Sequence, residues 1–168
     1  MAVAEIIGAA VGVLMLVLVA YILVGATLST AEIVVTAQKD QTLLSEARLR
    51  TDLALNQSEI SITGYGLNFS VTNTGNEVIG SFTHLDVYTF DNVSEEYEHY
   101  TYNGRTPAPK KWALMRIDND YIHPNQIDPG EKAWIMVTFS GNDPVWVMLS
   151  TNNGVTAQLT APAEGWRP

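Results

Sequence analysis

Cysteine is absent from the 168 residues, and no lysine or arginine precedes Lys39. Without cysteine the chain has no disulfide, no thiolate nucleophile and no metal site built on sulfur ligands. Basic residues are scarce throughout: nine lysines and arginines stand against eighteen aspartates and glutamates, for a formal net charge of −9. Because an acidic chain repels phosphate backbones, we expect no nucleic-acid partner.

Sequence signatures of catalysis are missing as well. The chain contains no nucleophile elbow, phosphate-binding loop or dinucleotide fingerprint, and no serine or threonine has a recognisable base partner. The three histidines, His84, His99 and His123, lie in different segments without the spacing of metal ligands, so we interpret them as surface or turn residues. We therefore expect no enzymatic activity, no catalytic residue and no cofactor.

One long uncharged run stands near the start of the chain. The 26 residues from Ile6 to Ala31 carry no charge and are apolar around the whole circumference of a helix. At about 1.5 Å per residue they would extend about 39 Å, enough to cross a hydrocarbon core of about 30 Å. The run is too long for a cleavable secretion signal, and no basic residue precedes it. We predict a helix that resides in a membrane at some stage.

Small residues recur within this helix. Ala4, Gly8 and Gly12 are four positions apart, and GAAVG is a GxxxG motif, which lets helix backbones approach closely. Glycine and alanine are also common in membrane helices that do not associate. Glu5 has two interpretations: an interfacial anion favoured by the helix dipole, or a partner for the positive amino terminus of a neighbouring subunit. We take these four residues as the candidate assembly residues.

The helix is expected to continue beyond the apolar run. Between Gly25 and Gly64 there is neither proline nor glycine, and apolar and charged residues alternate in an imperfect amphipathic pattern. We predict one helix from about residue 3 to about residue 55 and assign residues 1–56 to it. Residues 57–168 are left for a head domain of ordinary size.

The head is expected to be rich in strands, because apolar residues there recur every second position. Gly75 is expected to supply a positive φ in one turn if that turn needs it, and Pro129-Gly130 suits a type II turn. The spacing predicts seven or eight short strands in an α+β protein, namely a long helix followed by an antiparallel immunoglobulin-like β-sandwich. The expected strand regions are GLNFSVTN, VIGSFTHLDVYTF (broken near Gly80), SEEYEHYTY, WALMRID, AWIMVTF, VWVMLST and VTAQLTA.

Polar and aromatic residues of the head suggest three weaker features. A turn-rich segment offers oxygen donors for a structural calcium ion, although its spacing is not that of an EF-hand: Asp118, Asp120, Asn125 and Asp128. Three sequons make candidate glycan acceptors of Asn56, Asn68 and Asn92, of which Asn92 lies in a polar turn and is the best placed. The four tryptophans are interpreted as core and edge residues, some of which could anchor contacts between subunits: Trp112, Trp134, Trp146 and Trp166.

The whole pattern resembles the archaellin and type IV pilin-like class. The residues that carry the resemblance are the apolar helix with its amphipathic continuation, FSVTNTGNEVIGSFTHLDVYTFDN, and IDPGEKAWIMV. The two head segments look especially like the β-domains of archaellins and of archaellum accessory proteins. Glu5 matches the acidic residue typical of the fifth mature position of pilins if Met1 is the mature terminus. The basic processing leader ending in glycine is not present in this sequence: either it was removed before this numbering begins, or the protein is never processed. The second option would favour a permanently anchored accessory protein.

The resemblance implies a mechanical function. The expected protein is a structural subunit of a helical extracellular filament, either an archaellum-like motility filament or a type IV pilus-like appendage. Copies of the chain would polymerise through their helices after a membrane-inserted stage, and motor or cell-envelope proteins would be further partners. The alternative is a membrane-anchored, stator-like archaellum accessory protein whose β-domain binds the cell envelope.

Overall fold

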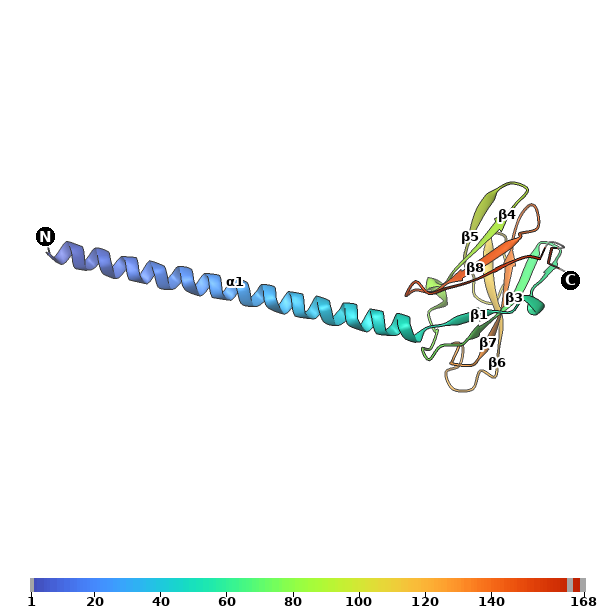
Figure 1. The fold of residues 1–168 in the computed structure, drawn as a ribbon, viewed down its shortest axis with the longest axis horizontal. Coiled ribbons are helices and arrows are strands. Elements are labelled where there is room, and N and C mark those ends of the chain that lie inside the picture. The colour runs from blue at the N-terminus through green and yellow to red at the C-terminus, as the bar shows by residue number, and fades with distance from the viewer. Residues whose placement is uncertain (1, 163–164, 167–168) are drawn as a thin grey trace. The chain divides into compact units, whose positions relative to one another are not determined.

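The structure is a computed structural model that describes residues 2–162 and 165–166. The chain divides into two compact units, Met1–Ser45 and Glu46–Pro168. Helix α1, Ala2–Arg50, accounts for the first unit and the first turn of the second (Figure 1). The question of whether Met1 is the mature terminus concerns a residue outside the described part of the chain.

Two threonine hydroxyls of the apolar run hydrogen-bond within helix α1. The hydroxyls of Thr27 and Thr30 donate to the carbonyls of Val24 and Ala26, each at 2.9 Å. Such bonds remove hydroxyl donors from an apolar surface, as a hydrocarbon surrounding requires. The helix ends at Arg50, so its expected end near residue 55 is wrong.

The head contains nine strands among the described residues, with two short 3₁₀ helices between them (Figure 1). The long alternating segments form strands as predicted, whereas the region around Gly80 contributes only a single bridge, Ile79 to Ile127, before its strand begins at Asp86. The elements are β1 (Leu53–Leu55), η1 (Gln57–Glu59), β2 (Ser61–Thr63), β3 (Gly66–Asn73), η2 (Phe82–His84), β4 (Asp86–Asp91), β5 (Glu96–Tyr102), β6 (Lys111–Asp118), β7 (Lys132–Thr138), β8 (Trp146–Ser150) and β9 (Thr156–Thr160).

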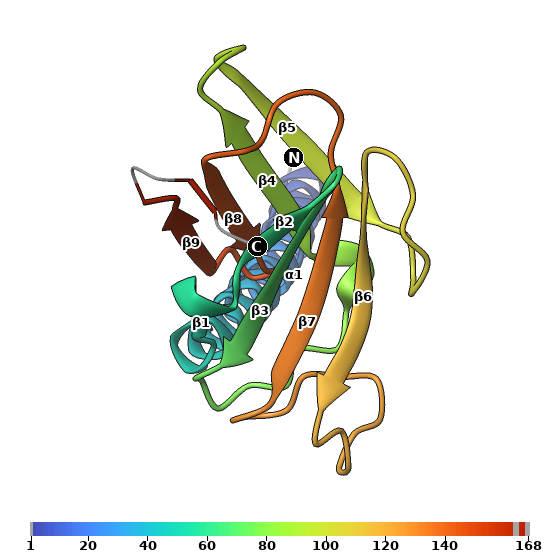
Figure 2. The ribbon, with the colours of Figure 1, turned by 90° about the vertical axis from the view of Figure 1, so that its right-hand side faces the viewer.

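The strands pair in the order β1-β3-β7-β6-β5-β4-β8-β9, with β2 added to β3. Two layers result, β1-β3-β7-β6 and β5-β4-β8-β9; Figure 2 shows β3, β7 and β6 of the first layer side by side. If β2 is left out, the other eight strands correspond in chain order to strands A, B, C, C′, D, E, F and G of an immunoglobulin-like domain. One sheet then has the order A-B-E-D and the other the order C′-C-F-G, as in that fold. The predicted fold class is confirmed: a long apolar helix followed by a mostly antiparallel β-sandwich.

One pairing departs from the antiparallel expectation. β5 and β6 run parallel and pair only at Thr101 with Lys111 and Tyr102 with Trp112. The chain crosses from one layer to the other between these two strands, and β6 therefore runs parallel to β5 where they meet. This short contact leaves most of β5 without a neighbour on that side.

The core lies between the two layers. Trp112 is completely buried and donates from Nε1 to the carbonyl of Leu85 at 3.2 Å. Trp166 is also buried, so Trp112 and Trp166 are core residues as predicted. Trp134 in β7 and Trp146 in β8 are partly exposed, on strands that pair with a neighbour on each side. The Pro129-Gly130 turn is confirmed as well: Gly130 has a φ of 84°, and the N–H of Glu131 donates to the carbonyl of Asp128 at 3.0 Å.

Candidate functional site

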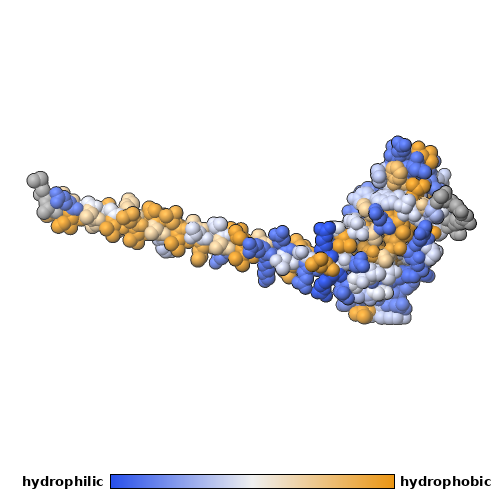
Figure 3. All heavy atoms as spheres, in the orientation of Figure 1, coloured by the Kyte–Doolittle hydropathy of each residue, from blue (hydrophilic) through white to orange (hydrophobic). Residues whose placement is uncertain are grey.

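Helix α1 is the first candidate site, because its apolar side chains are not buried against any other part of the chain that the structure describes. All described side chains from Val3 to Ser45 are exposed, and Figure 3 shows hydrophobic surface along the N-terminal part of the helix. The helix is long and apolar enough to cross a membrane. Burial of this surface therefore requires lipid or other polypeptide chains.

The candidate assembly residues all lie in this helix. Ala4, Gly8 and Gly12 share one face because residues four apart are neighbours on a helix. A Cβ atom added at Gly8 or Gly12 would meet no other atom within 4 Å, so each glycine opens a shallow depression on the surface. Glu5 lies in the first turn, where the helix dipole favours a carboxylate. Close packing of a second helix on this face stays a prediction.

The second candidate site is the group of loops that hold the last helical turn, Glu46–Arg50. The final carbonyls of a helix have no partner within the helix. The carbonyl of Arg50 accepts hydrogen bonds from the N–H groups of Asn76 at 2.7 Å and Glu77 at 3.2 Å. The carbonyl of Ala47 accepts from the N–H of Thr51 at 3.1 Å and from its hydroxyl at 2.8 Å. Head residues thus cap the helix end by direct main-chain contact.

Gly75 makes this capping possible. Its N–H donates to the carbonyl of Asp52 at 3.1 Å, beside the N–H of Thr74 at 3.0 Å. A Cβ atom at position 75 would lie 2.4 Å from both the carbonyl oxygen of Arg50 and the nitrogen of Asp52. Gly75 is not among the residues with positive φ, so the turn does not need one. Glycine is required here because two backbone segments pass close to one another.

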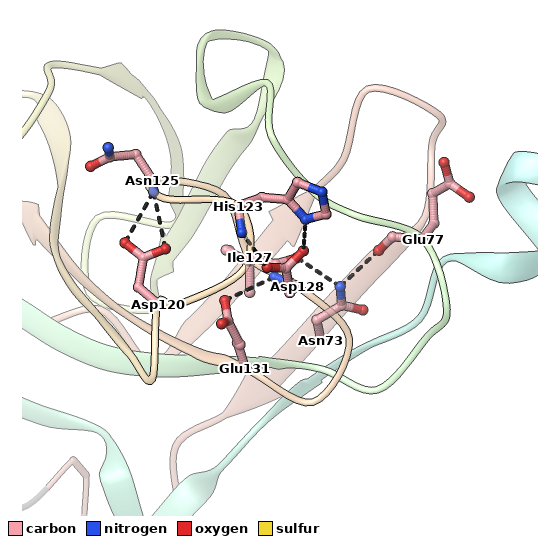
Figure 4. Close-up of polar contacts among 8 residues, drawn as sticks. All are labelled: Asn73, Glu77, Asp120, His123, Asn125, Ile127, Asp128 and Glu131. Carbon is pink, nitrogen blue, oxygen red and sulfur yellow. Dashed lines mark hydrogen bonds and ion pairs between the residues drawn. The ribbon is translucent and has the colours of Figure 1, made fainter.

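Asn73 joins the two segments that carry the archaellin-like resemblance (Figure 4). Its side-chain nitrogen donates to the carbonyls of Glu77 at 2.8 Å and Ile127 at 2.9 Å. Its carbonyl accepts from the N–H of Gly130 at 2.8 Å, and its own N–H donates to the carbonyl of Glu131 at 3.0 Å. Asn73 is completely buried. The loop that caps the helix is therefore fixed to the turn before β7 by one amide side chain.

Asp128 holds the second of these segments in place. Its carboxylate accepts from the N–H of His123 at 3.0 Å and lies 2.6 Å from His123 Nδ1, while its own N–H donates to Glu131 Oε2 at 3.0 Å (Figure 4). Burial acts to raise the pKa of the Asp128 carboxyl, but the contacts with the ring and backbone N–H of His123 outweigh it and hold that pKa below its ordinary value.

We expect Asp128→Asn to make the free energy of unfolding of the head less dependent on pH in the acidic range. A carboxyl whose folded-state pKa lies below its unfolded value of about 3.9 stabilises the fold above that value, and the contribution is lost as the pH falls through the lower pKa. At pH 7 the variant should therefore unfold at a lower urea concentration than the wild type. The difference in free energy of unfolding between the two proteins should shrink as the pH falls from 5 to 3, because the wild type alone loses the contribution of this carboxylate. An unchanged difference across that range would contradict this role.

The four oxygen donors proposed for calcium do not converge. Asp118 accepts from Trp134 Nε1 at 2.8 Å and pairs with Arg116 at 3.1 Å. Asp120 accepts from the N–H of Asn125, and Asp128 is paired with His123. The described residues hold no group of three or more histidine, aspartate or glutamate side chains that could bind a metal ion. These four residues therefore do not form a calcium site in the described part of the chain, because turn backbone and neighbouring side chains use the carboxylates.

The remaining histidines lie at the surface, as expected. His84 Nδ1 lies 2.6 Å from the hydroxyl of Ser81, and His99 Nε2 lies 2.7 Å from Asp86. His99 also stacks on Tyr88. Like His123, both are exposed.

The three sequons differ in accessibility. Asn92 is exposed in the turn between β4 and β5. Asn56 is exposed, but its side-chain oxygen caps η1 by accepting from the N–H of Ser58 at 3.1 Å. Asn68 lies within β3, between β2 and β7, and is partly buried. Asn92 stays the best-placed acceptor, and its modification stays a prediction.

A row of aromatic side chains lies on the outer face of the β5-β4-β8 sheet, and it was not predicted from the sequence. The rings of Phe90 and Tyr97 lie 4.6 Å apart, and those of Tyr97 and Trp146 lie 5.9 Å apart. Phe90 is directly opposite both Tyr97 and Trp146 in the strand register. Period-two alternation in YTF and EYEHY could have indicated this row once the strands were placed side by side.

Comparison with known proteins gives no family for this chain. No protein-family model matches it, and no curated protein matches it. Among solved structures, the archaellum periplasmic stator protein FlaG from Sulfolobus acidocaldarius is similar, with 18% identity, 65% of this chain and 97% of that chain covered, and a TM-score of 0.46. The periplasmic stator complex of FlaF and FlaG from the same organism gives 18% identity, coverage of 64% and 85%, and a TM-score of 0.46. Likeness at this level assigns neither family nor function.

Proposed function

We propose that this protein is a membrane-anchored β-sandwich module of an archaellum-related surface apparatus. Helix α1 holds it in the bilayer, and the head acts beyond the membrane on a component of the cell envelope. The observation that carries the proposal is the continuity of α1. One uninterrupted helix runs from the uncharged residues into the turn whose last carbonyls are hydrogen-bonded by loops of the head.

The two parts of α1 suit different surroundings. Residues 6–31 lack charge, whereas Glu32, Lys39, Asp40 and Glu46 follow them. The second part, residues 32–50, would extend about 28 Å from the bilayer as a polar stalk at about 1.5 Å per residue. A head that must resist displacement needs a firm attachment to such a stalk. The main-chain bonds to Arg50 and the Gly75 contact hold the last helical turn within the head unit and suit this requirement.

The archaellum-related part of the proposal is supported by the sequence resemblance of the head. The two segments that carry it meet at Asn73, which hydrogen-bonds both of them at the base of the helix. They therefore form one structural unit whose position suits attachment of the helix.

The test is to locate the full chain in its own cells. Membranes washed with alkaline carbonate and sheared surface appendages should be compared by mass spectrometry, with electron microscopy of the appendages. An anchored module stays in the washed membranes and is absent from the main appendage band. Its presence as the main protein of the appendages would replace this proposal with the filament subunit.

A filament subunit is the second candidate function, favoured by the spacing of Ala4, Gly8 and Gly12 beside Glu5. Burial of about 1,000 Å² of apolar helix surface against other copies would contribute roughly 25 kcal/mol gross at about 25 cal/mol per Å². A heterologous contact that does not close gives a helical polymer.

For this second function, Gly8→Leu or Gly12→Leu should reduce filament formation about tenfold or more, because a branched side chain keeps helices from close approach. Ala10→Leu adds similar bulk on the opposite side of the helix and is the matched control. Filaments should be counted by electron microscopy, with circular dichroism to verify that the head stays folded. Normal filaments in both glycine variants would show that this face does not pack.

A further inference from the structure

Strand β5 has a free edge. On one side it pairs with β4 from Glu96 to Tyr100, and on the other it meets β6 only at Thr101 and Tyr102. Within the part of the chain that the structure describes, no other strand pairs with β5. Its backbone from residue 96 to residue 100 thus presents unpaired hydrogen-bonding groups, which is the requirement for adding a further strand.

The hairpin arm formed by β4 and β5, residues 86–102, is strongly acidic. It carries five carboxylates and no lysine or arginine: Asp86, Asp91, Glu95, Glu96 and Glu98. Hydrogen bonds from Ser94, Asn142 and the N–H of Val93 lower the pKa of the Asp91 carboxyl to about 2, so it stays ionised in mild acid. Carboxylates along an edge oppose pairing with a second copy of the same strand.

The two sides of this edge differ in chemistry. On the outer side Tyr97 is 71% exposed and packs on Phe90 and Trp146. On the inner side Glu96 and Glu98 line a cavity of about 200 Å³ between the arm and the loop after β7. In Figure 3 hydrophobic and hydrophilic surfaces lie next to each other on this arm. A strand added to β5 would therefore meet aromatic rings on one face and carboxylates on the other.

We propose that the edge of β5 binds an extended, basic polypeptide segment as an additional strand. Lysine or arginine side chains at alternate positions pair with Glu96 and with Glu98, at the second of which they replace Lys110, whose Nζ lies 3.6 Å from Glu98 Oε1. Apolar side chains between them cover Tyr97. Charge complementarity selects this occupant, since the acidic edge repels a second copy and attracts a cationic strand. Arginine suits the carboxylate side because its guanidinium can pair with a carboxylate through two parallel hydrogen bonds. The inference names a partner class for the head's binding role, and in that respect it rests on the proposed function.

The test uses the full chain in lipid nanodiscs and a labelled eight-residue peptide of alternating arginine and valine. Fluorescence anisotropy should detect binding, and hydrogen exchange should slow at those alternate amides of residues 96–100 whose N–H groups point away from β4. A peptide of alternating glutamate and valine should bind at least tenfold more weakly. Equal binding of the two peptides, or slowed exchange elsewhere but not at β5, would overturn the proposal. Slowed exchange at β5 on raising the protein concentration without peptide would assign the edge to a second copy and also overturn it.

The double variant Glu96→Gln with Glu98→Gln should weaken binding of the arginine peptide about tenfold, because exposed ion pairs contribute modestly and glutamine keeps the size of the side chain. The matched control, Glu32→Gln with Asp40→Asn, changes the net charge equally on exposed positions of α1 and should leave the affinity unchanged. Equal losses in both double variants would show attraction by net charge alone and contradict a site at β5. Retention of the chain in washed membranes is measured separately, so failure of the anchor and failure of this site are distinguishable.

Discussion

Gly75→Ala is expected to destabilise the head by about 3 kcal/mol or more, a large effect for the addition of one methyl group. The added Cβ would lie 2.4 Å from both the Arg50 carbonyl oxygen and the Asp52 nitrogen. Both are backbone atoms, so no side-chain rotation relieves the overlap. The loop would have to move away, and the hydrogen bonds from Asn76 and Glu77 to the Arg50 carbonyl would lengthen or break.

Urea unfolding followed by tryptophan fluorescence in detergent measures the loss of stability, and hydrogen exchange at Thr51, Asn76 and Glu77 reports on the cap itself. Gly64→Ala is the matched control, because a Cβ at Gly64 meets no atom within 4 Å and only its φ of 60° opposes alanine. That strain costs about 1 kcal/mol. Equal destabilisation by the two variants would mean that the contact at Gly75 does not hold the helix end.

Gly75 also illustrates what sequence reasoning can and cannot predict. NTGN is a turn signal, and a turn is found there. The turn signal predicts only a local role for Gly75, a positive φ if the turn needs one. In the structure Gly75 has no positive φ and instead allows a close tertiary contact with the backbone of Arg50 and Asp52. The close approach involves residues about 25 positions earlier in the chain, and no local pattern encodes that distance.

The fold class was predictable because the two parts of the chain have different periodicities. Apolar residues that cover every side of a helix, followed by alternation at every second residue, indicate a membrane-type helix and a half-buried sheet. In β3 and β7 the alternating residues fill the core: Leu67 and Phe69 in the first strand, and Ile135 and Val137 in the second, are all buried.

The end of the helix and two strands were not predictable in the same way. Leu53–Leu55 continues a helix-favouring sequence, but it pairs with Asn73, Thr72 and Val71 of β3 and becomes β1. Strand β2 also has only three residues and is formed by pairing with β3. Tertiary pairing outweighs helix propensity in such short segments, because propensity differs by only some tenths of a kcal/mol per residue.

The candidate sites also differ in how far the sequence predicts them. The apolar helix could be recognised from composition alone. Asn73, by contrast, is important through bonds to Glu77 and Ile127, the second of which is 54 residues away. The free edge of β5 depends on the brief parallel contact with β6, and sandwich-like spacing gives no indication of such a contact. The sequence therefore predicts the apolar helix but not the surfaces that only the folded head creates.

Both candidate functions depend on the apolar residues 6–31 of α1, and charged substitutions within them give the second large expected effect. Leu18→Asp with Val19→Asp places two carboxylates at the middle of residues 6–31, on neighbouring sides of α1. Each charged residue at the centre of a membrane helix costs about 3 kcal/mol. The pair should therefore make the free energy of membrane insertion about 6 kcal/mol less favourable. At about 1.4 kcal/mol per factor of ten, this lowers the insertion equilibrium constant roughly ten-thousandfold.

Alkaline-carbonate extraction followed by immunoblotting measures this loss: the variant should move from the membrane pellet to the supernatant. Gln38→Asp with Gln41→Asp is the matched control, because it adds the same two charges to the polar continuation of α1 and should leave the protein in the pellet. The head should unfold at the same urea concentration in both variants, since residues 18 and 19 lie outside its compact unit. Retention of the Leu18/Val19 variant in the pellet would mean that contacts other than the apolar helix hold the protein at the membrane.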